Sequence, residues 1–303
     1  MVRWGIGVPA HLAGASRESV LQYARRAESL GFDSVWVGDR IVFDNLDPLL
    51  TLAALAAATE TVELAPTTFI APARSPVEVA KFFATLDVLS AGRCRPVLSV
   101  GHRPDDYAAT GRAYAGRGDA LDEMITILRT AWAADAIVFH GRHYDLDLAP
   151  VGPRPVREGG LPLWFGGDSP RARKRAVMHG AGHMSGTAGR DKTRALPADF
   201  RALCASLGRD YRSFGLGATA YFALGSDPQL ALDQGMTNLL PYYRTLHWDP
   251  VIDVIWGPRD AAARRIVDYG ALDMETFVFV PSAFDVDQLD MLRDVVDRIE
   301  AVS

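Results

Sequence analysis

The sequence predicts a closed (β/α)8 barrel, an α/β fold, and three observations support this prediction. Short apolar runs of strand character alternate with longer segments of helical period, as in parallel sheets built from repeated β-α units. We count eight such runs, whereas an open doubly wound sheet more often has about five to seven strands. The first run, residues 4–8, is not followed by the G-x-G-x-x-G turn of a dinucleotide-binding sheet. We therefore expect one barrel domain over residues 1–303.

The helices between the strands have clear start and stop residues. Ser16 can cap a helix whose apolar residues lie on one face, and Gly31 ends that helix. Ser75 precedes a proline and opens a second helix, and a third follows Pro258 and runs to Gly270. The strands are expected at residues 4–8, 34–37, 62–70, 95–100, 163–166, 183–185, 217–224 and 276–280.

Two segments exceed a minimal barrel, and we expect them to be insertions after the fourth and seventh strands. Residues 145–160 are rich in proline, glycine and arginine, and residues 227–256 include Trp248 and Trp256. Long excursions of this kind often form lids or interfaces. The two tryptophans belong either to the core of the second insertion or to the wall of a substrate pocket.

The composition is that of an ordinary globular protein and excludes several classes. Of the 303 residues, 49% are hydrophobic and 23% are charged, with a formal net charge of −5, which argues against disorder and against a nucleic-acid partner. Cys94 and Cys204 form no C-x-x-C pair, so we expect neither a disulfide framework nor a bound metal. No signal-peptide core and no apolar run of about 18 residues occurs. We expect a cytoplasmic protein without a membrane partner.

Polar residues follow most of the expected strands, at the end of the barrel where (β/α)8 enzymes build their active sites. The candidates after the first four strands are His11, Asp39, Arg40, Thr67, Thr68, Arg74, Ser99, Gly101 and His102. His102, with an ordinary pKa of about 6.5, either suits proton transfer near neutral pH or is a surface histidine of a loop. His183 opens the sixth strand and is either a structural residue or a pocket residue.

The turn after the fifth strand has the features of a phosphate site. Gly166 and Gly167 let the backbone approach a ligand, and Asp168 or Ser169 can cap the helix that follows. Pro170 suits the first helical position, and free N–H groups at a helix start attract phosphate. The alternative is a capped strand-to-helix turn that binds nothing.

Several segments resemble the luciferase-like monooxygenase family. They are residues 35–40 (VWVGDR), 47–59 (DPLLTLAALAAAT), 80–93 (AKFFATLDVLSAGR), 161–167 (LPLWFGG) and 257–260 (GPRD), in the order found in the family. The resemblance implies a (β/α)8 barrel that binds flavin mononucleotide (FMN) or the deazaflavin coenzyme F420, usually as a homodimer. It leaves the substrate open.

Carried over by position, the resemblance implies that Asp39 lies beside the coenzyme ring. Deazaflavin-using members usually have a histidine after this aspartate, and Arg40 stands in its place here. Because arginine keeps its proton at ordinary pH, Arg40 can bind an anion or polarise a carbonyl but cannot act as a general base. The resemblance also implies a non-proline cis peptide bond at Thr67–Thr68 that backs the ring; the alternative is two ordinary strand threonines.

The fourth strand departs from the family, whose Gly-x-Gly-x-Gly pattern is represented only by Gly101, because Val97 and Ser99 replace the other two glycines. We expect Asp39, Arg40 and His102 to be catalytic, and His11, Arg74, His183 and Trp256 to contact the substrate. The residues expected to bind the cofactor are Asp39, Thr67, Thr68, Ser99, Gly101, Gly166, Gly167, Asp168 and Ser169.

Three functions remain under this resemblance. The first is hydride transfer between F420 and a small organic substrate, which the position of Asp39 favours. The second is an FMN-dependent monooxygenase that uses O2, with a reductase or dehydrogenase partner supplying reduced cofactor. The third, motivated by Arg40 and the fourth strand, is a degenerate member that binds a flavin without turnover. A Schiff-base aldolase is disfavoured because no lysine lies near the expected strand ends.

Overall fold

A computed structural model describes residues 2–12, 14–186, 189–243, 249, 253–283 and 285–301. Its main sheet is parallel and contains β1 (Arg3–Gly7), β2 (Ser34–Val37), β3 (Glu63–Pro66), β4 (Phe69–Ile70), β5 (Val97–Ser99), β8 (Trp164–Gly166), β9 (Gly182–Ser185), β10 (Gly215–Leu224) and β12 (Thr276–Pro281). Their order is β3-β2-β1-β12-β10-β9-β8-β5-β4. The two outermost strands, β3 and β4, are consecutive in the chain, so the sheet is nearly closed. The predicted (β/α)8 barrel is confirmed.

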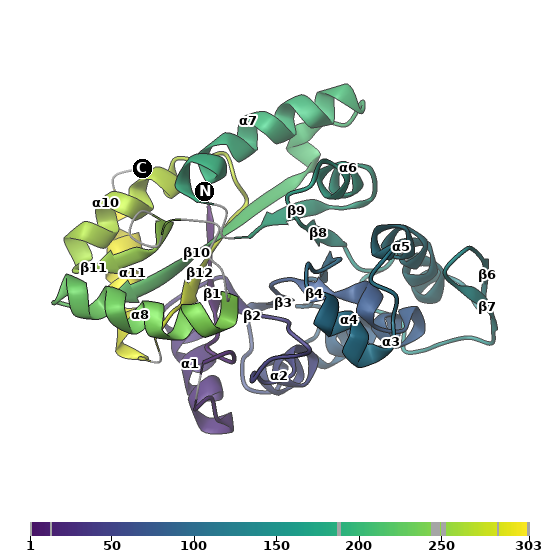
Figure 1. The fold of residues 1–303 in the computed structure, drawn as a ribbon, viewed down its shortest axis with the longest axis horizontal. Helices are drawn as coiled ribbons and strands as arrows, with labels where there is room; N and C mark the ends of the chain where they lie inside the picture. The colour runs from purple at the N-terminus through teal and green to yellow at the C-terminus, as the bar shows by residue number, and fades with distance from the viewer. Residues whose placement is uncertain are drawn as a thin grey trace.

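Helices cover the outside of this sheet (Figure 1). They are α1 (Arg17–Ser29), α2 (Pro48–Ala56), α3 (Pro76–Leu89), α4 (Pro104–Thr110), α5 (Arg117–Ala133), α6 (Pro170–His179), α7 (Arg190–Ser206), α8 (Pro228–Tyr243), α10 (Arg259–Gly270) and α11 (Asp287–Glu300). The predicted cap of α1 is present, because the Ser16 hydroxyl accepts the Ser19 N–H at 3.3 Å, and Gly31 follows with φ +77°.

The interior of the barrel is filled by side chains. A buried cluster combines one residue from each of six segments of the sheet: Trp36, Ala65, Val97, Trp164, Met184 and Val278. Gly182 leaves room for the largest of them, since a Cβ atom at this position would lie 2.5 Å from the Trp164 ring. The barrel is therefore a packed core below its rim, and ligand chemistry belongs at the strand ends.

The structure adds elements that the sequence did not predict. The strand expected over 62–70 is divided into β3 and β4 on either side of Thr67 and Thr68. Between β5 and β8 the chain forms α4, α5 and an antiparallel hairpin of β6 (Ile137–His140) and β7 (Asp145–Leu148), which projects from one end of the molecule (Figure 1). Between β10 and β12 it forms α8, β11 (Ile255–Gly257) and α10, and β11 pairs with β10. Of the two segments expected as insertions, 145–160 begins with β7, and 227–256 contains α8 and ends within β11.

Among the described residues, no helix combines the length and the apolar character needed to span a bilayer.

Candidate active site at the barrel mouth

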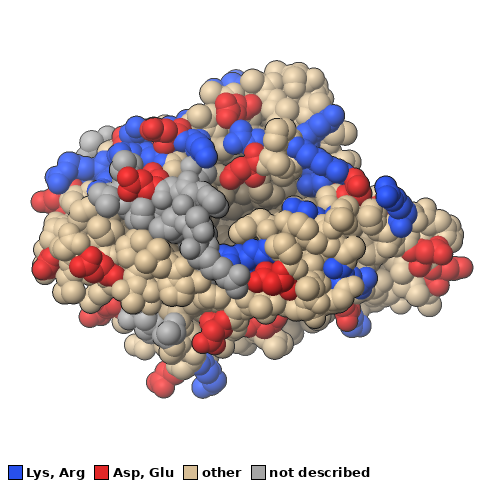
Figure 2. All heavy atoms as spheres, viewed as in Figure 1, with Lys and Arg blue, Asp and Glu red and all other residues tan. Residues whose placement is uncertain are grey.

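The C-terminal ends of β2 to β8 bring most of the predicted site residues to one rim, which we call the mouth. Asp39 follows β2, Thr67 and Thr68 separate β3 from β4, and Ser99 and Gly166 end β5 and β8. Figure 2 shows a hollow near the middle of one face of the molecule, with lysine or arginine side chains at its edge.

Asp39 forms a buried, two-pronged ion pair with Arg74. Arg74 Nη1 and Nη2 donate to the two carboxylate oxygens at 2.8 and 2.9 Å, and the Ile70 N–H donates to Oδ2 at 2.8 Å. The Asp39 side chain is 0% exposed. Burial raises the pKa of the Asp39 carboxyl, while the charge and hydrogen bonds of Arg74 act against this shift. Arg74, predicted to contact the substrate, therefore first holds Asp39.

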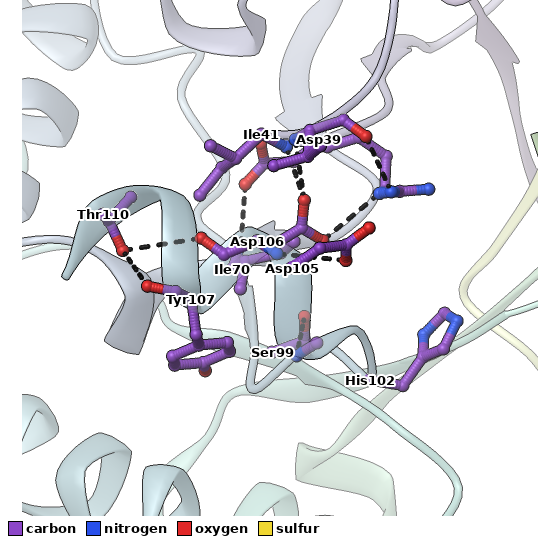
Figure 3. Close-up of polar contacts among 12 residues, drawn as sticks. Asp39, Ile41, Ile70, Ser99, His102, Asp105, Asp106, Tyr107 and Thr110 are labelled. Atoms are coloured by element: carbon purple, nitrogen blue, oxygen red, sulfur yellow. Dashed lines mark hydrogen bonds and ion pairs between the residues drawn. The ribbon is translucent and has the colours of Figure 1, made fainter. Parts of the chain in front are cut away.

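Arg40 forms the second buried pair of the mouth, with Asp106 of α4. Arg40 Nε donates to Asp106 Oδ2 at 3.2 Å, and Nη2 donates to the Val42 carbonyl at 3.1 Å. The other oxygen, Asp106 Oδ1, accepts the N–H groups of Ile41 and Val42 at 3.0 and 2.8 Å. Figure 3 shows Asp106 between α4 and the loop that follows β2. Asp106 thus connects the loop after β2 to α4, which follows β5.

Asp106 was not among the predicted site residues. It lies 66 positions from Arg40, so no local pattern joins the two. The sequence offered one signal for this pair. Asp106 stands in the first turn of a helix after the fourth predicted strand, and Arg40 follows the second, so both lie at the same end of the barrel.

The peptide bond between Thr67 and Thr68 is cis, as the family resemblance implies. Thr68 lies against the turn after β8, because a Cβ atom at Gly166 would lie 2.6 Å from Thr68 Cγ2. Gly101 has φ +59°, and a Cβ there would lie 2.9 Å from Ile70 Cγ2. Ser99 Oγ accepts the Gly101 N–H at 3.4 Å. These contacts fix a continuous backbone wall from β4 to β8.

The turn after β8 has the predicted geometry. Ser169, rather than Asp168, caps α6, since its hydroxyl accepts the Ala172 N–H at 3.2 Å. Gly167 has φ +112°, a conformation that favours glycine. Arg171 does not add free charge, because its Nη2 bonds to Asp119 and Asp122 of α5. The anion-attracting groups of this turn are therefore backbone N–H groups at a helix start.

Two predicted histidines lie in different surroundings. His11 follows β1 and is buried, and burial lowers its pKa to about 4, so the imidazole is neutral at pH 7. Figure 3 shows His102 at the edge of the group formed by Asp39, Asp105 and Asp106.

His183 lies on the opposite side of β9 from the barrel interior. Its ring packs against that of Phe200 of α7 at a centroid distance of 4.6 Å, whereas the neighbouring Met184 joins the interior cluster. Burial lowers the pKa of His183 to about 3. The interpretation of His183 as a substrate contact is corrected: strand alternation directs it to the helix layer.

Trp256 belongs to the small core beside β11. It packs with Tyr221, Leu239 and Val254, and the Arg265 guanidinium lies 4.8 Å from its ring centroid. Trp256 is half-buried there and contributes to the core of the second insertion.

Within the described ranges, no three histidine, cysteine, aspartate or glutamate side chains gather as metal ligands. A phosphorylated flavin-type coenzyme fits the donor set better. The rim offers a hydrogen-bonded carboxylate at Asp39, a backbone wall along Thr67 and Thr68, and an exposed glycine turn at a helix start.

The fold and this rim define a barrel oxidoreductase of the flavin or deazaflavin type. The match to the family model "luciferase-like monooxygenase" covers residues 2–278, and the chain belongs to this family. It is 28% identical over 319 residues to the F420-dependent hydroxymycolic acid dehydrogenase of Mycobacterium tuberculosis, covering 95% of this chain and 86% of that protein.

Two further proteins, one a flavin-dependent oxygenase component and one an F420-dependent dehydrogenase, are similar to this chain. The oxygenase component of a flavin-dependent trigonelline monooxygenase from Acinetobacter baylyi is 24% identical, over 54% of this chain and 46% of that protein. The structure of an F420-dependent secondary alcohol dehydrogenase, in complex with an F420-acetone adduct, superposes with a TM-score of 0.84 at 22% identity, over 98% of this chain and 99% of that one. This second similarity concerns the fold alone.

Proposed function

We propose that this chain is an F420-dependent oxidoreductase that transfers a hydride between the coenzyme and a small organic substrate. The observation that carries the proposal is the buried Asp39 at the end of β2, fixed by Arg74 and the Ile70 N–H. Similarity along 95% of the chain to an F420-dependent dehydrogenase supports the choice of coenzyme.

The chain's own residues orient the coenzyme and exclude water from the reacting face. Asp39, bonded to Arg74 and the Ile70 N–H, holds the end of β2 in place, and the wall formed by Thr67, Thr68 and Ser99 gives the ring a rigid support. The turn at Gly167 and the start of α6 take the phosphate of the tail. When bound, the deazaflavin supplies two-electron hydride transfer, which is the coenzyme's chemistry.

Position 40 supplies no proton in this proposal. The guanidinium of Arg40 holds its protons at ordinary pH and is bonded to Asp106 and the Val42 carbonyl. His11 is neutral at pH 7 because burial lowers its pKa to about 4. His102 at the edge of the mouth is then the candidate for exchanging a proton with the substrate.

An FMN-dependent monooxygenase is the second candidate function, and the similarity to the flavin-dependent oxygenase component supports it. In that case a separate reductase supplies reduced FMN, and in the first case a separate dehydrogenase supplies reduced F420. Titrating the purified chain with each coenzyme, followed by fluorescence and absorbance, separates the two. Saturable uptake of F420 alone supports the proposal, uptake of FMN alone selects the monooxygenase, and uptake of neither contradicts both.

Gly167→Asp is the matching variant for the tail site. It places a side chain and a negative charge where φ is +112° and the phosphate is expected, so we expect coenzyme affinity to fall at least about tenfold. Gly14→Asp, also at a positive-φ glycine but with open space around it, is the control. Equal effects of the two substitutions would place the phosphate elsewhere.

We also propose that the chain acts in the cytoplasm as a homodimer. Leu50 of α2 and Phe82 and Leu89 of α3 are large apolar side chains that are 75%, 43% and 60% exposed, and these two helices are neighbours. Analytical ultracentrifugation of the chain and of Leu50→Glu tests the homodimer. We expect a dimer that the charge weakens, and a monomeric parent chain would contradict the proposal.

A further inference from the structure

A cavity lies at the end of the barrel opposite the mouth. It opens between the starts of β3, β8, β10 and β12 and has a volume of about 580 Å³. We call it the base cavity and define it by Arg95, Arg157, Arg212, Trp164, Phe214 and Glu275. Its volume lies in the range of small-molecule sites, roughly 300–1,000 Å³. The proposed reaction at the mouth does not use it.

Arg95 forms the floor of the base cavity. Its Nη2 lies 2.8 Å from carboxylate oxygens of both Glu63 and Glu275, and its guanidinium lies 4.4 Å from the Trp164 ring centroid. The side chain is 93% buried, being 7% exposed. Within the part of the chain that the structure describes, Nη1 has no hydrogen-bond partner, and this atom is itself buried. Arg95 therefore gives the floor a positive charge, and the groups that can contact a ligand directly are at the rim.

The charges around the base cavity favour an anion. Each carboxylate of the wall already has an arginine: Glu63 bonds to Arg3 and Arg95, Glu275 to Arg95, and Asp273 to Arg201. The remaining two arginines of the wall differ. Among the described residues neither Arg157 nor Arg212 forms an ion pair, and Arg157 donates instead to the Gly92 carbonyl.

One part of the wall is apolar. Phe214, Leu216 and Met274 line the cavity next to Trp164. Arginines beside apolar surface match a ligand with a planar anionic head and an apolar body, because a guanidinium pairs with carboxylate or phosphate oxygens in a fixed geometry.

We propose that the base cavity is a second ligand site, which binds a small organic anion: a carboxylate or phosphate group carried on an apolar body. Arg157 and Arg212 bind the anionic group at the rim, and Arg95 closes the floor. The proposal is independent of the coenzyme and of the reaction at the mouth.

The test uses the full chain and four probes in isothermal titration calorimetry. Benzoate and phenyl phosphate carry the two anionic groups on the same ring, benzamide is the neutral analogue of benzoate, and inorganic phosphate lacks the apolar body. We expect benzoate or phenyl phosphate to bind, and the better of the two identifies the head group. Benzamide and inorganic phosphate are expected to bind at least about tenfold more weakly.

Two variants locate the binding. Arg212→Gln and Arg157→Gln each remove one cation of the rim that forms no ion pair within the described ranges. Each is expected to weaken binding of the better probe about tenfold. Arg154→Gln is the matched control, since Arg154 lies in the same segment as Arg157 but pairs with Asp135 away from the cavity. The Trp164 indole N–H signal should shift on binding.

Three outcomes would overturn the proposal. The first is no binding of either aromatic anion up to about 10 mM, where a site worth about 2.7 kcal/mol is half filled. The second is equal binding of benzoate and benzamide, and the third is an Arg154→Gln effect as large as those at Arg157 and Arg212. Because no coenzyme is added, failure here leaves the proposed function untouched.

Discussion

The two ends of the barrel use the same ingredients, arginines paired with carboxylates, in opposite ways. At the mouth Asp39 and Asp106 each pair with one arginine, and both are withdrawn from water: their side chains are 0% and 1% exposed. At the base one buried arginine, Arg95, is shared by two carboxylates, and Glu275 is 39% exposed.

This difference teaches what each end can do. A buried pair is costly to break, because removing one partner leaves the other charge without compensation in a poor solvent. It therefore holds the loops of the mouth in one arrangement, as a rigid site requires. A shared, partly exposed pair is weakly coupled to the fold, so the base can accept another charged group without unfolding.

The largest expected effect comes from breaking the Asp39 pair. Asp39→Ala leaves the Arg74 guanidinium and the Ile70 N–H without their acceptor, so we expect a loss of about 3–5 kcal/mol in the free energy of unfolding. Glu275→Ala at the base should cost within about 1 kcal/mol, because Arg95 keeps Glu63 and the lost carboxylate was partly solvated. Urea denaturation measures both, and similar losses would erase the distinction between the two ends.

Breaking the Arg40–Asp106 pair should lower the free energy of unfolding slightly less than Asp39→Ala does. The size of the loss should depend on the side chain that replaces the Asp106 carboxylate. Asp106→Ala removes the acceptor of Arg40 and of two backbone N–H groups, for an expected loss of about 3 kcal/mol. Asp106→Asn keeps an oxygen that can accept the N–H groups of Ile41 and Val42, and should lose about half as much.

The control for this pair is Asp44→Asn, an exposed carboxylate in the same loop. Hydrogen exchange of the Ile41 and Val42 amides should accelerate strongly in Asp106→Ala, less in Asp106→Asn and not in Asp44→Asn. Unchanged exchange in Asp106→Ala would show that the loop is held by other contacts.

Acid should weaken the protein through its buried histidines. The pKa of His11 is lowered to about 4 and that of His183 to about 3, from an ordinary 6.5, so the folded state binds these protons less readily than the unfolded state. Their contribution is complete above pH 6.5 and is lost as the pH falls toward the folded pKa values.

Between pH 7 and pH 5 each buried histidine should therefore cost about 2 kcal/mol of stability. Denaturation of the chain and of His183→Leu at the two pH values checks this, since the variant should lose less stability on acidification. Because His183 lies away from the mouth, coenzyme affinity of His183→Leu at pH 7 should match that of the parent. A large fall in affinity would instead restore a ligand role for this histidine.

Much of the fold could be predicted because its signals are local. The Ser16 cap, the Gly31 exit and the helix that ends at Gly270 follow from residues within a few positions of one another, and the structure confirms them. The division of the strand at 62–70 and the hairpin at 137–148 were missed. Residues 67 and 68 have ordinary strand composition, and the short alternation of the hairpin resembles a loop.

The candidate site shows the same limit. Its location followed from the barrel rule, and the turn at Gly167 and Ser169 followed from helix capping. Of the two alternatives for His183, the structural one fits the strand alternation: its neighbour Met184 faces the interior, so His183 faces the helices. The partner of Arg40 was unpredictable, since Asp106 lies in another β-α unit.

The sequence by itself determined a barrel of repeated β-α units, the family, and the rim at which polar residues gather, because these depend on periodicity, capping and local motifs. Only the tertiary structure decided that Asp39 pairs with Arg74 and Arg40 with Asp106. It also decided that a cavity opens at the other end, lined by two arginines that form no ion pair among the described residues. Such pairings join residues from different β-α units. Their energies depend on burial and on distances in space, and neither can be derived from the local sequence.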